Sequence, residues 1–163
     1  MGMGHIRIVE LVLLGLYPAL LCASIGADVA RRIIPNAVVV SLIAAFAAVT
    51  FLIPVPDLIF RLAAAGAVTA LGFSLFAEDI IGAGDAKLAG AIVLWADPLH
   101  LPLFVLATGT IGAMLGIAAA ARHRFAGVDD AALADRRRAS LPYGVALAGA
   151  GLIIHPLSSM LHP

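Results

Sequence analysis

The sequence predicts an all-α, polytopic membrane protein with six transmembrane helices. Of its 163 residues, 63% are hydrophobic and only 12% are charged, and the mean hydropathy is +1.09. Soluble domains are about 45–50% apolar and about 25% charged, so a small soluble core could not bury this much apolar surface. The apolar residues also form long runs, and about 20 such residues let a helix cross a bilayer. We therefore expect residues 1–163 to form a single membrane-embedded domain.

Polar or proline-containing breaks divide the chain into six apolar segments. The first contains Pro18, which favours a kink, and the third contains Arg61, whose long side chain is expected to reach the membrane interface. The fourth is short and begins with polar residues. The first segment could be mistaken for a cleaved signal peptide. This interpretation is disfavoured because Glu10 lies in the early part of the segment, and because the segment is long enough to span the membrane. The expected spans are residues 8–27, 37–53, 58–77, 86–96, 99–121 and 141–157, with a polar loop at 122–140.

Positive charge is distributed unevenly between the two sides of this predicted bundle. Cytoplasmic loops of membrane proteins carry an excess of Lys and Arg. Only Arg7 and Arg61, of the ten basic residues, lie outside the connections after the first, third and fifth spans. These connections, including loop 122–140, are therefore predicted to face the cytoplasm, and both termini are predicted to lie on the extracytoplasmic side. The predicted location of the protein is the cytoplasmic (inner) membrane. The basic residues of these connections are Arg31, Arg32, Lys87, Arg122, Arg124, Arg136, Arg137 and Arg138.

The composition also narrows the range of partners and cofactors. The formal net charge is zero, so no overall field indicates a nucleic-acid partner. Cys22 is the only cysteine, which excludes an internal disulfide and a CxxC zinc site. The five histidines are scattered without the spacing of metal ligands. We expect no metal and no cofactor, and the lipid bilayer is the partner that the composition itself predicts.

Asp85 is the most unusual residue in this apolar chain. It lies in the stretch IIGAGDAKL, residues 80–88, and an ionisable residue in or beside a membrane span is by default a candidate functional residue. Gly82 and Gly84 leave room for another chain, such as a substrate backbone, to approach closely. Asp28 stands 57 residues earlier, at the end of the first span on the same predicted side. The topology therefore places two carboxylates at one membrane depth.

Two aspartates that share a site could support acid–base chemistry. Neighbouring carboxyl groups do not both ionise readily, so the pair holds one proton. Such a pair can activate a water molecule and protonate a carbonyl oxygen, as aspartic peptidases do. The sequence contains no GxSxG, HExxH or phosphate-loop motif. Structural alternatives remain open, because Asp28 could be a solvated carboxylate at a helix end and Asp85 could cap the fourth helix.

Three segments resemble the type IV prepilin peptidases, a family of GxGD aspartic proteases. IIGAGDAKL resembles the family's GxGD-x-K-L signature, DVARRIIPN at 28–36 is similar to its first aspartate motif, and LPYGVALAGAG at 141–151 is similar to its last helix. The segments stand in the family's order and extend over nearly the whole chain. The resemblance implies an aspartic endopeptidase that cleaves the short basic leader of prepilins at the cytoplasmic face, with Asp28 and Asp85 as the catalytic pair.

The same resemblance implies further site residues and a substrate class. Gly82, Gly84, Pro35 and Asn36 belong to the matching motifs and are expected to shape the site. Lys87 either tunes the neighbouring aspartate or holds substrate, or else extends toward the interface. The compact form is similar to the peptidases of tight-adherence (Flp) pilus systems or to archaeal preflagellin peptidases. Larger members have paired cysteines and methylate the new N-terminus, so N-methyltransferase activity is not expected here.

Other classes of function remain open. A small transporter or channel could use Asp85 as a proton relay, although transporters place such acids near the midplane of repeated halves and no internal repeat is found. A non-catalytic subunit of a secretion system could keep the same fold. Within the peptidase interpretation, Glu78 and Asp79 could attract the basic leader, while the arginines at 136–138 hold the loop against anionic lipid. The particular pilin and the oligomeric state stay undetermined.

Overall fold

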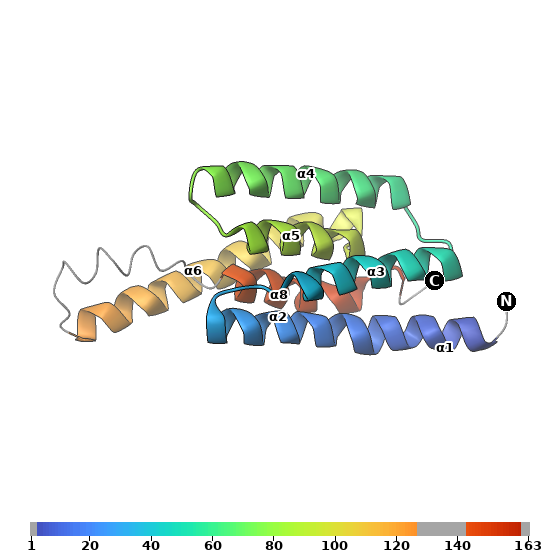
Figure 1. The fold of residues 1–163 in the computed structure, drawn as a ribbon, viewed down its shortest axis with the longest axis horizontal. Coiled ribbons are helices and arrows are strands. Elements are labelled where there is room, and N and C mark those ends of the chain that lie inside the picture. Colours follow the sequence, from blue (N-terminus) through green and yellow to red (C-terminus); the bar gives the residue numbers. More distant parts are fainter. Residues whose placement is uncertain (1–2, 127–142, 161–163) are drawn as a thin grey trace.

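The computed structural model describes residues 3–126 and 143–160, and this part of the chain contains helices and turns but no strand. The all-α prediction is confirmed for these residues. The predicted loop begins later than residue 122, because the preceding helix continues to Ala126; residues 127–142, with the three arginines at 136–138, lie outside the described part. The elements are α1 (Met3–Leu11), the π-helical turn η1 (Val12–Leu16), α2 (Tyr17–Arg31), α3 (Asn36–Leu52), α4 (Leu58–Ala77), α5 (Ala83–Trp95), the 3₁₀ turn η2 (Pro98–His100), α6 (Leu101–Ala126), α8 (Tyr143–Ile154) and the 3₁₀ turn η3 (His155–Leu157) (Figure 1).

Each predicted span corresponds to a helix, but the helices differ in length. Three segments are long and apolar enough to cross a membrane, namely Arg7–Arg31, Leu58–Ala77 and Pro98–Ala121, whereas Asn36–Leu52 and Tyr143–Leu157 are shorter apolar helices. The remaining helix, α5, has 13 residues. At the rise of an α-helix this is about 20 Å, compared with about 30 Å for the hydrocarbon core. Six complete crossings, and the orientation of the termini, therefore stay predictions.

The connections between helices gather at two ends of the bundle. The α2–α3 and α4–α5 connections lie at one end, on the left in Figure 1, and the α3–α4 connection and the start of α1 lie at the other. Asp28 is in the last turn of α2 and Asp85 is in the first turn of α5. This arrangement agrees with the prediction that the two acids share one depth.

Helix α5 is enclosed by other helices. It packs against α4, α8 and α3, with α4 on one side of it and α3 and α8 on the other in Figure 1. Its residues are buried on all sides, and a helix that is apolar all round belongs inside a bundle. Protein therefore surrounds a helix that is too short to meet both membrane faces. The buried residues of α5 are Asp85, Ala86, Leu88 and Gly90 to Trp95.

Two glycines let α4 and α5 approach each other closely. A Cβ atom at Gly72 would lie 2.7 Å from the Cβ of Ala86, and one at Gly90 would overlap the hydroxyl oxygen of Thr69. Contacts between small residues of this kind hold helices together in membranes, where lipid competes with apolar side chains. Gly66, which also lies on α4, makes no such contact, since no atom outside its own helix backbone lies within 4 Å of a Cβ there.

Replacing Gly90 with alanine is expected to destabilise the bundle. The added methyl group must push Thr69 away or separate α4 from α5, and overpacking of this kind costs about 1–3 kcal/mol. The free energy of unfolding of purified protein in mixed detergent micelles would measure the loss. Gly66→Ala on α4 is the matched control, since open space surrounds that position; equal stability of the two variants would contradict the close α4–α5 packing.

The predicted irregularity at Pro18 takes the form of the π-helical turn η1. Tyr17 N–H donates to the carbonyl oxygen of Val12, five residues earlier. Pro18 has no N–H to continue this pattern, so the next carbonyl, that of Leu13, needs another donor. His155 supplies it through Nε2, 2.7 Å from the Leu13 oxygen. A side chain from the C-terminal part of the chain thus satisfies the backbone group that the proline leaves free.

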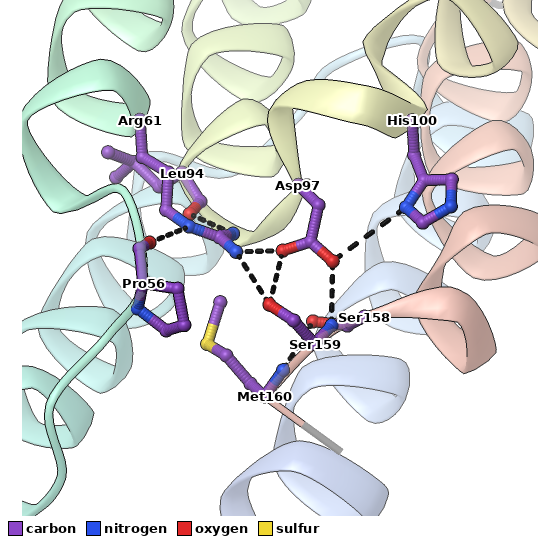
Figure 2. A network of polar contacts seen from close by, with 8 residues as sticks. All are labelled: Pro56, Arg61, Leu94, Asp97, His100, Ser158, Ser159 and Met160. Atoms are coloured by element: carbon purple, nitrogen blue, oxygen red, sulfur yellow. Dashed lines mark hydrogen bonds and ion pairs between the residues drawn. The ribbon is translucent and has the colours of Figure 1, made fainter. Parts of the chain in front are cut away.

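Arg61 does not extend to the membrane interface, so that prediction was wrong. The residue is only 1% exposed and forms an ion pair with Asp97, which follows α5 (Figure 2). Its Nε also donates to the Pro56 carbonyl oxygen at 2.9 Å. Asp97 in turn accepts the Ser159 N–H at 2.6 Å and the Ser159 hydroxyl at 2.8 Å. This network joins α4, the end of α5 and the C-terminal segment, and a buried charge with several partners is compatible with an apolar bundle.

Candidate active site

A cavity of about 350 Å³ lies where the α2–α3 and α4–α5 connections meet. Its lining combines the end of α2, the connection to α3 and the start of α5, so residues far apart in the sequence come together there. Among them are both aspartates of the predicted pair. The lining residues are Asp28, Arg32, Ile33, Ile34, Asn36, Gly82, Ala83, Gly84, Asp85 and Lys87.

Asp28 is buried in the last turn of α2 and is held by the backbone of another helix. It is only 4% exposed, so it is not the solvated helix-end carboxylate of the structural alternative. Its Oδ2 accepts a hydrogen bond of 3.0 Å from the N–H of Val145, in the first turn of α8. Arg32 ends α2 in the left-handed conformation, with its N–H bonded to the Asp28 carbonyl oxygen at 2.9 Å. The chain thus turns away just after Asp28 and leaves its carboxyl group facing the cavity.

Asp85 is the third residue of α5 and is 9% exposed. Its Oδ2 accepts the N–H of Gly82 at 3.2 Å, so the carboxylate does cap the helix as the structural alternative proposes. The same carboxylate also lines the cavity, and capping and chemistry are therefore compatible.

The surroundings of Asp85 favour its protonated form. This residue precedes the apolar part of α5 and lies outside the segments that could cross the membrane. Burial raises the pKa of the Asp85 carboxyl to about 6, the hydrogen bond from Gly82 opposes the increase, and the nearby charge of Asp28 adds to it. A carboxyl group whose pKa is raised in this way keeps its proton to a higher pH than an ordinary aspartate and can act as a general acid.

Ile34 separates the helices that meet at the cavity. A Cβ on Gly84 of α5 would lie 3.3 Å from the Cβ of Ile34, and a Cβ on Gly144 of α8 would lie 2.9 Å from its Cδ1. The buried isoleucine therefore contacts α5 on one side and α8 on the other. Pro35, which is expected to shape the site, is the N-cap residue of α3. It is not part of the cavity lining.

The remaining predicted residues fall into two groups. Lys87 Nζ donates to Asn36 Oδ1 at 3.4 Å, which links the start of α5 to the start of α3, and both residues line the cavity. Glu78 and Asp79 are exposed in the α4–α5 connection and are absent from that lining. The structure therefore brings Lys87 and Asn36 to the two aspartates but leaves the acidic turn outside.

The sequence singles out residues 141–151 by their resemblance to the family's last helix, but it does not predict that α8, which begins there, contacts Asp28. Nothing in the sequence shows that a backbone N–H at the start of this helix bonds to Asp28. Two carboxyl groups, one with a pKa raised to about 6 and one hydrogen-bonded to a helix N-terminus, can together activate water and protonate a carbonyl oxygen. Among the residues that the structure describes, no three His, Cys, Asp or Glu side chains are placed to hold a metal ion.

Comparison with known proteins identifies the chain's relatives at the level of a family. The family model of the type IV leader peptidase family matches residues 15–117, which is more than half of the chain. The match begins in η1 and ends in α6, so it includes both aspartates and every residue that lines the cavity. Comparisons with curated proteins and with solved structures find no match.

Proposed function

Because the chain belongs to the type IV leader peptidase family, we propose that it is a membrane aspartic endopeptidase that cleaves the short basic leader of Flp-type prepilins at the cytoplasmic face of the inner membrane. The observation that carries the proposal is that Asp28 and Asp85, 57 residues apart in sequence, line one cavity. The cavity volume of about 350 Å³ is sufficient for the reacting segment of a peptide, since binding pockets begin at about 300 Å³.

The two aspartates have different roles in the proposed reaction. Asp28, as the carboxylate, takes a proton from a water molecule while the water oxygen bonds to the scissile carbonyl carbon. Asp85 gives its proton to the carbonyl oxygen, which forms a tetrahedral intermediate. When the carbon–nitrogen bond breaks, the leaving nitrogen takes the proton from Asp28, and the hydroxyl group returns a proton to Asp85. The pair is thereby restored, with one proton between the two carboxyl groups.

The geometry favours hydrolysis over the transport alternative. A proton relay needs acids at successive depths along a path, whereas Asp28 and Asp85 line the same cavity at one end of the bundle. The glycines at 82 and 84 are consistent with the approach of a peptide backbone. The substrate class, the cytoplasmic orientation and the absence of N-methylation are part of the proposal.

A reconstituted cleavage assay tests the proposed function. The purified protein in lipid nanodiscs would be incubated with candidate Flp-type prepilins, and the products would be analysed by mass spectrometry. We expect loss of the basic leader and a new N-terminus without an added methyl group. If no prepilin with a basic leader is cleaved by protein that elutes as a folded species, the proposed function is wrong.

The pH profile of cleavage is expected to fall on its alkaline side. An acid with a raised pKa keeps its proton to higher pH, so Asp85, with a pKa of about 6, is protonated below that pH and loses the proton above it. The value of kcat should therefore decline as the pH rises through about 6, with an apparent midpoint that belongs to the coupled pair. Measurement at saturating prepilin removes effects on binding. A kcat that increases through this range would show that Asp85 is not the acid.

A further inference from the structure

The first turn of α8 packs closely against Asp28. A Cβ atom on Gly144 would lie 2.7 Å from Asp28 Oδ2 and 2.9 Å from its Cγ, distances that real Cβ atoms do not reach. The next residue, Val145, donates its N–H to the same oxygen at 3.0 Å. Gly144 and Val145 are the second and third residues of a 12-residue helix, so the positive end of the helix dipole points at the carboxylate.

Two independent observations thus concern one oxygen atom. The hydrogen bond fixes where Oδ2 lies, and the missing side chain at Gly144 allows the backbone of α8 to come close enough to make that bond. The hydrogen bond to Asp28 comes from the backbone of α8 and not from one of its side chains. The backbone of α8 therefore orients the aspartate. This close approach of the backbone requires a glycine at position 144.

We propose that the first turn of α8, through Gly144 and the N–H of Val145, is the positioning element for Asp28. The proposal rests on the proposed function, because it concerns the residue assigned as the base. Gly144 is a positioning residue and does not touch substrate. Its replacement by alanine forces either the Asp28 carboxyl group or the start of α8 to move, and the Val145 hydrogen bond is lost in both cases.

A double-mutant cycle on stability tests the contact without any assay of cleavage. Ile34→Val is included in every protein, because it removes the Cδ1 atom that also lies 2.9 Å from a Cβ at position 144. Within this background, Gly144→Ala is compared in proteins with Asp28 and with Asp28→Ala by thermal unfolding in detergent. We expect Gly144→Ala to lower Tm strongly in the protein with Asp28 and much less in the protein with Asp28→Ala. In the latter there is no carboxyl group at position 28 for the new methyl group to collide with. Equal falls would overturn the contact, whatever the protein's activity.

Cleavage kinetics then test the positioning role. In the Ile34→Val background, Gly144→Ala should reduce kcat by about 100-fold, the effect expected of a misplacement of about 1 Å, while KM for the prepilin stays unchanged because the substrate contacts are intact. Gly149→Ala, on the same helix, is the control, since only the flexible end of Ile111 lies near its Cβ. If the parent protein cleaves prepilin and Gly144→Ala retains its kcat, the positioning role is wrong although the proposed function stands. If no parent protein cleaves any prepilin, the proposed function fails, and the stability cycle still decides the contact.

Discussion

Asp28→Asn and Asp85→Asn are each expected to abolish prepilin cleavage. Asparagine has nearly the shape of aspartate but can neither accept the proton from water nor deliver one to the carbonyl oxygen. General acid–base groups contribute about 10²–10⁴-fold each, and the two residues act as one unit, so each single variant should lose nearly all of the activity that the double variant loses. Single-turnover cleavage of a prepilin in nanodiscs would measure the decrease.

The control for these variants is Asp79→Asn. Asp79 is an exposed acid outside the cavity lining, with a φ of 57°, and asparagine tolerates the left-handed conformation well. At saturating prepilin this variant should cleave at the rate of the parent protein, which would show that loss of a negative charge near the α4–α5 connection is not enough to stop the chemical step. The assignment of the catalytic pair is wrong if Asp28→Asn or Asp85→Asn processes prepilin normally and the variant protein has unchanged chromatographic behaviour.

Arg61→Met is expected to have the largest effect on stability. The variant leaves Asp97 buried without its cation, and removal of one member of a buried ion pair costs about 3–5 kcal/mol. The free energy of unfolding in mixed micelles would measure the loss. Because the network lies at the opposite end of α5 from the cavity, the protein that remains folded should keep its KM.

The matched variant is Arg61→Met combined with Asp97→Leu. Removal of both charges also removes the desolvation cost of the pair, and apolar replacement of a buried pair is often neutral or stabilising. The double variant should therefore be more stable than Arg61→Met alone, although the N–H of Ser159 then loses its acceptor. A double variant that is no more stable than the single one would show that the ion pair is not what makes Arg61 important.

The helices could be predicted from the sequence because long apolar runs have few alternatives in a bilayer. The third span, residues 58–77, coincides with α4. The shared depth of Asp28 and Asp85 followed from the number of spans between them. The burial of Arg61 could not be predicted in this way, because the rule for a lone cation near the end of a span assumes that headgroups are its best partner. Its actual partner, Asp97, is 36 residues away in sequence.

The parts of the site that depend on the backbone were also outside the reach of the sequence. The sequence does not distinguish Gly66 from Gly72 and Gly90, yet of these three glycines only Gly72 and Gly90 face another helix at close range. The bond from Val145 to Asp28 uses an N–H group that almost every residue has, so no residue type signals it. Such contacts depend on the relative placement of whole helices, which the local pattern does not contain.

The acids at the two ends of α5 have a consequence for the register of the bundle. The close contacts at Gly72 and Gly90 already oppose sliding of α5 along α4, and the polar residues at the ends of α5 add to this effect. Asp85, in the first turn of α5, caps the helix through the N–H of Gly82 and lines the cavity that it shares with Asp28, and Asp97 follows the helix end in a pair with Arg61. A slip by one residue is about 1.5 Å along the axis and would disturb both contacts together. Polar residues at the two ends thus act together with the α4–α5 packing to set how deep in the bundle this helix lies, and with it the height of Asp85.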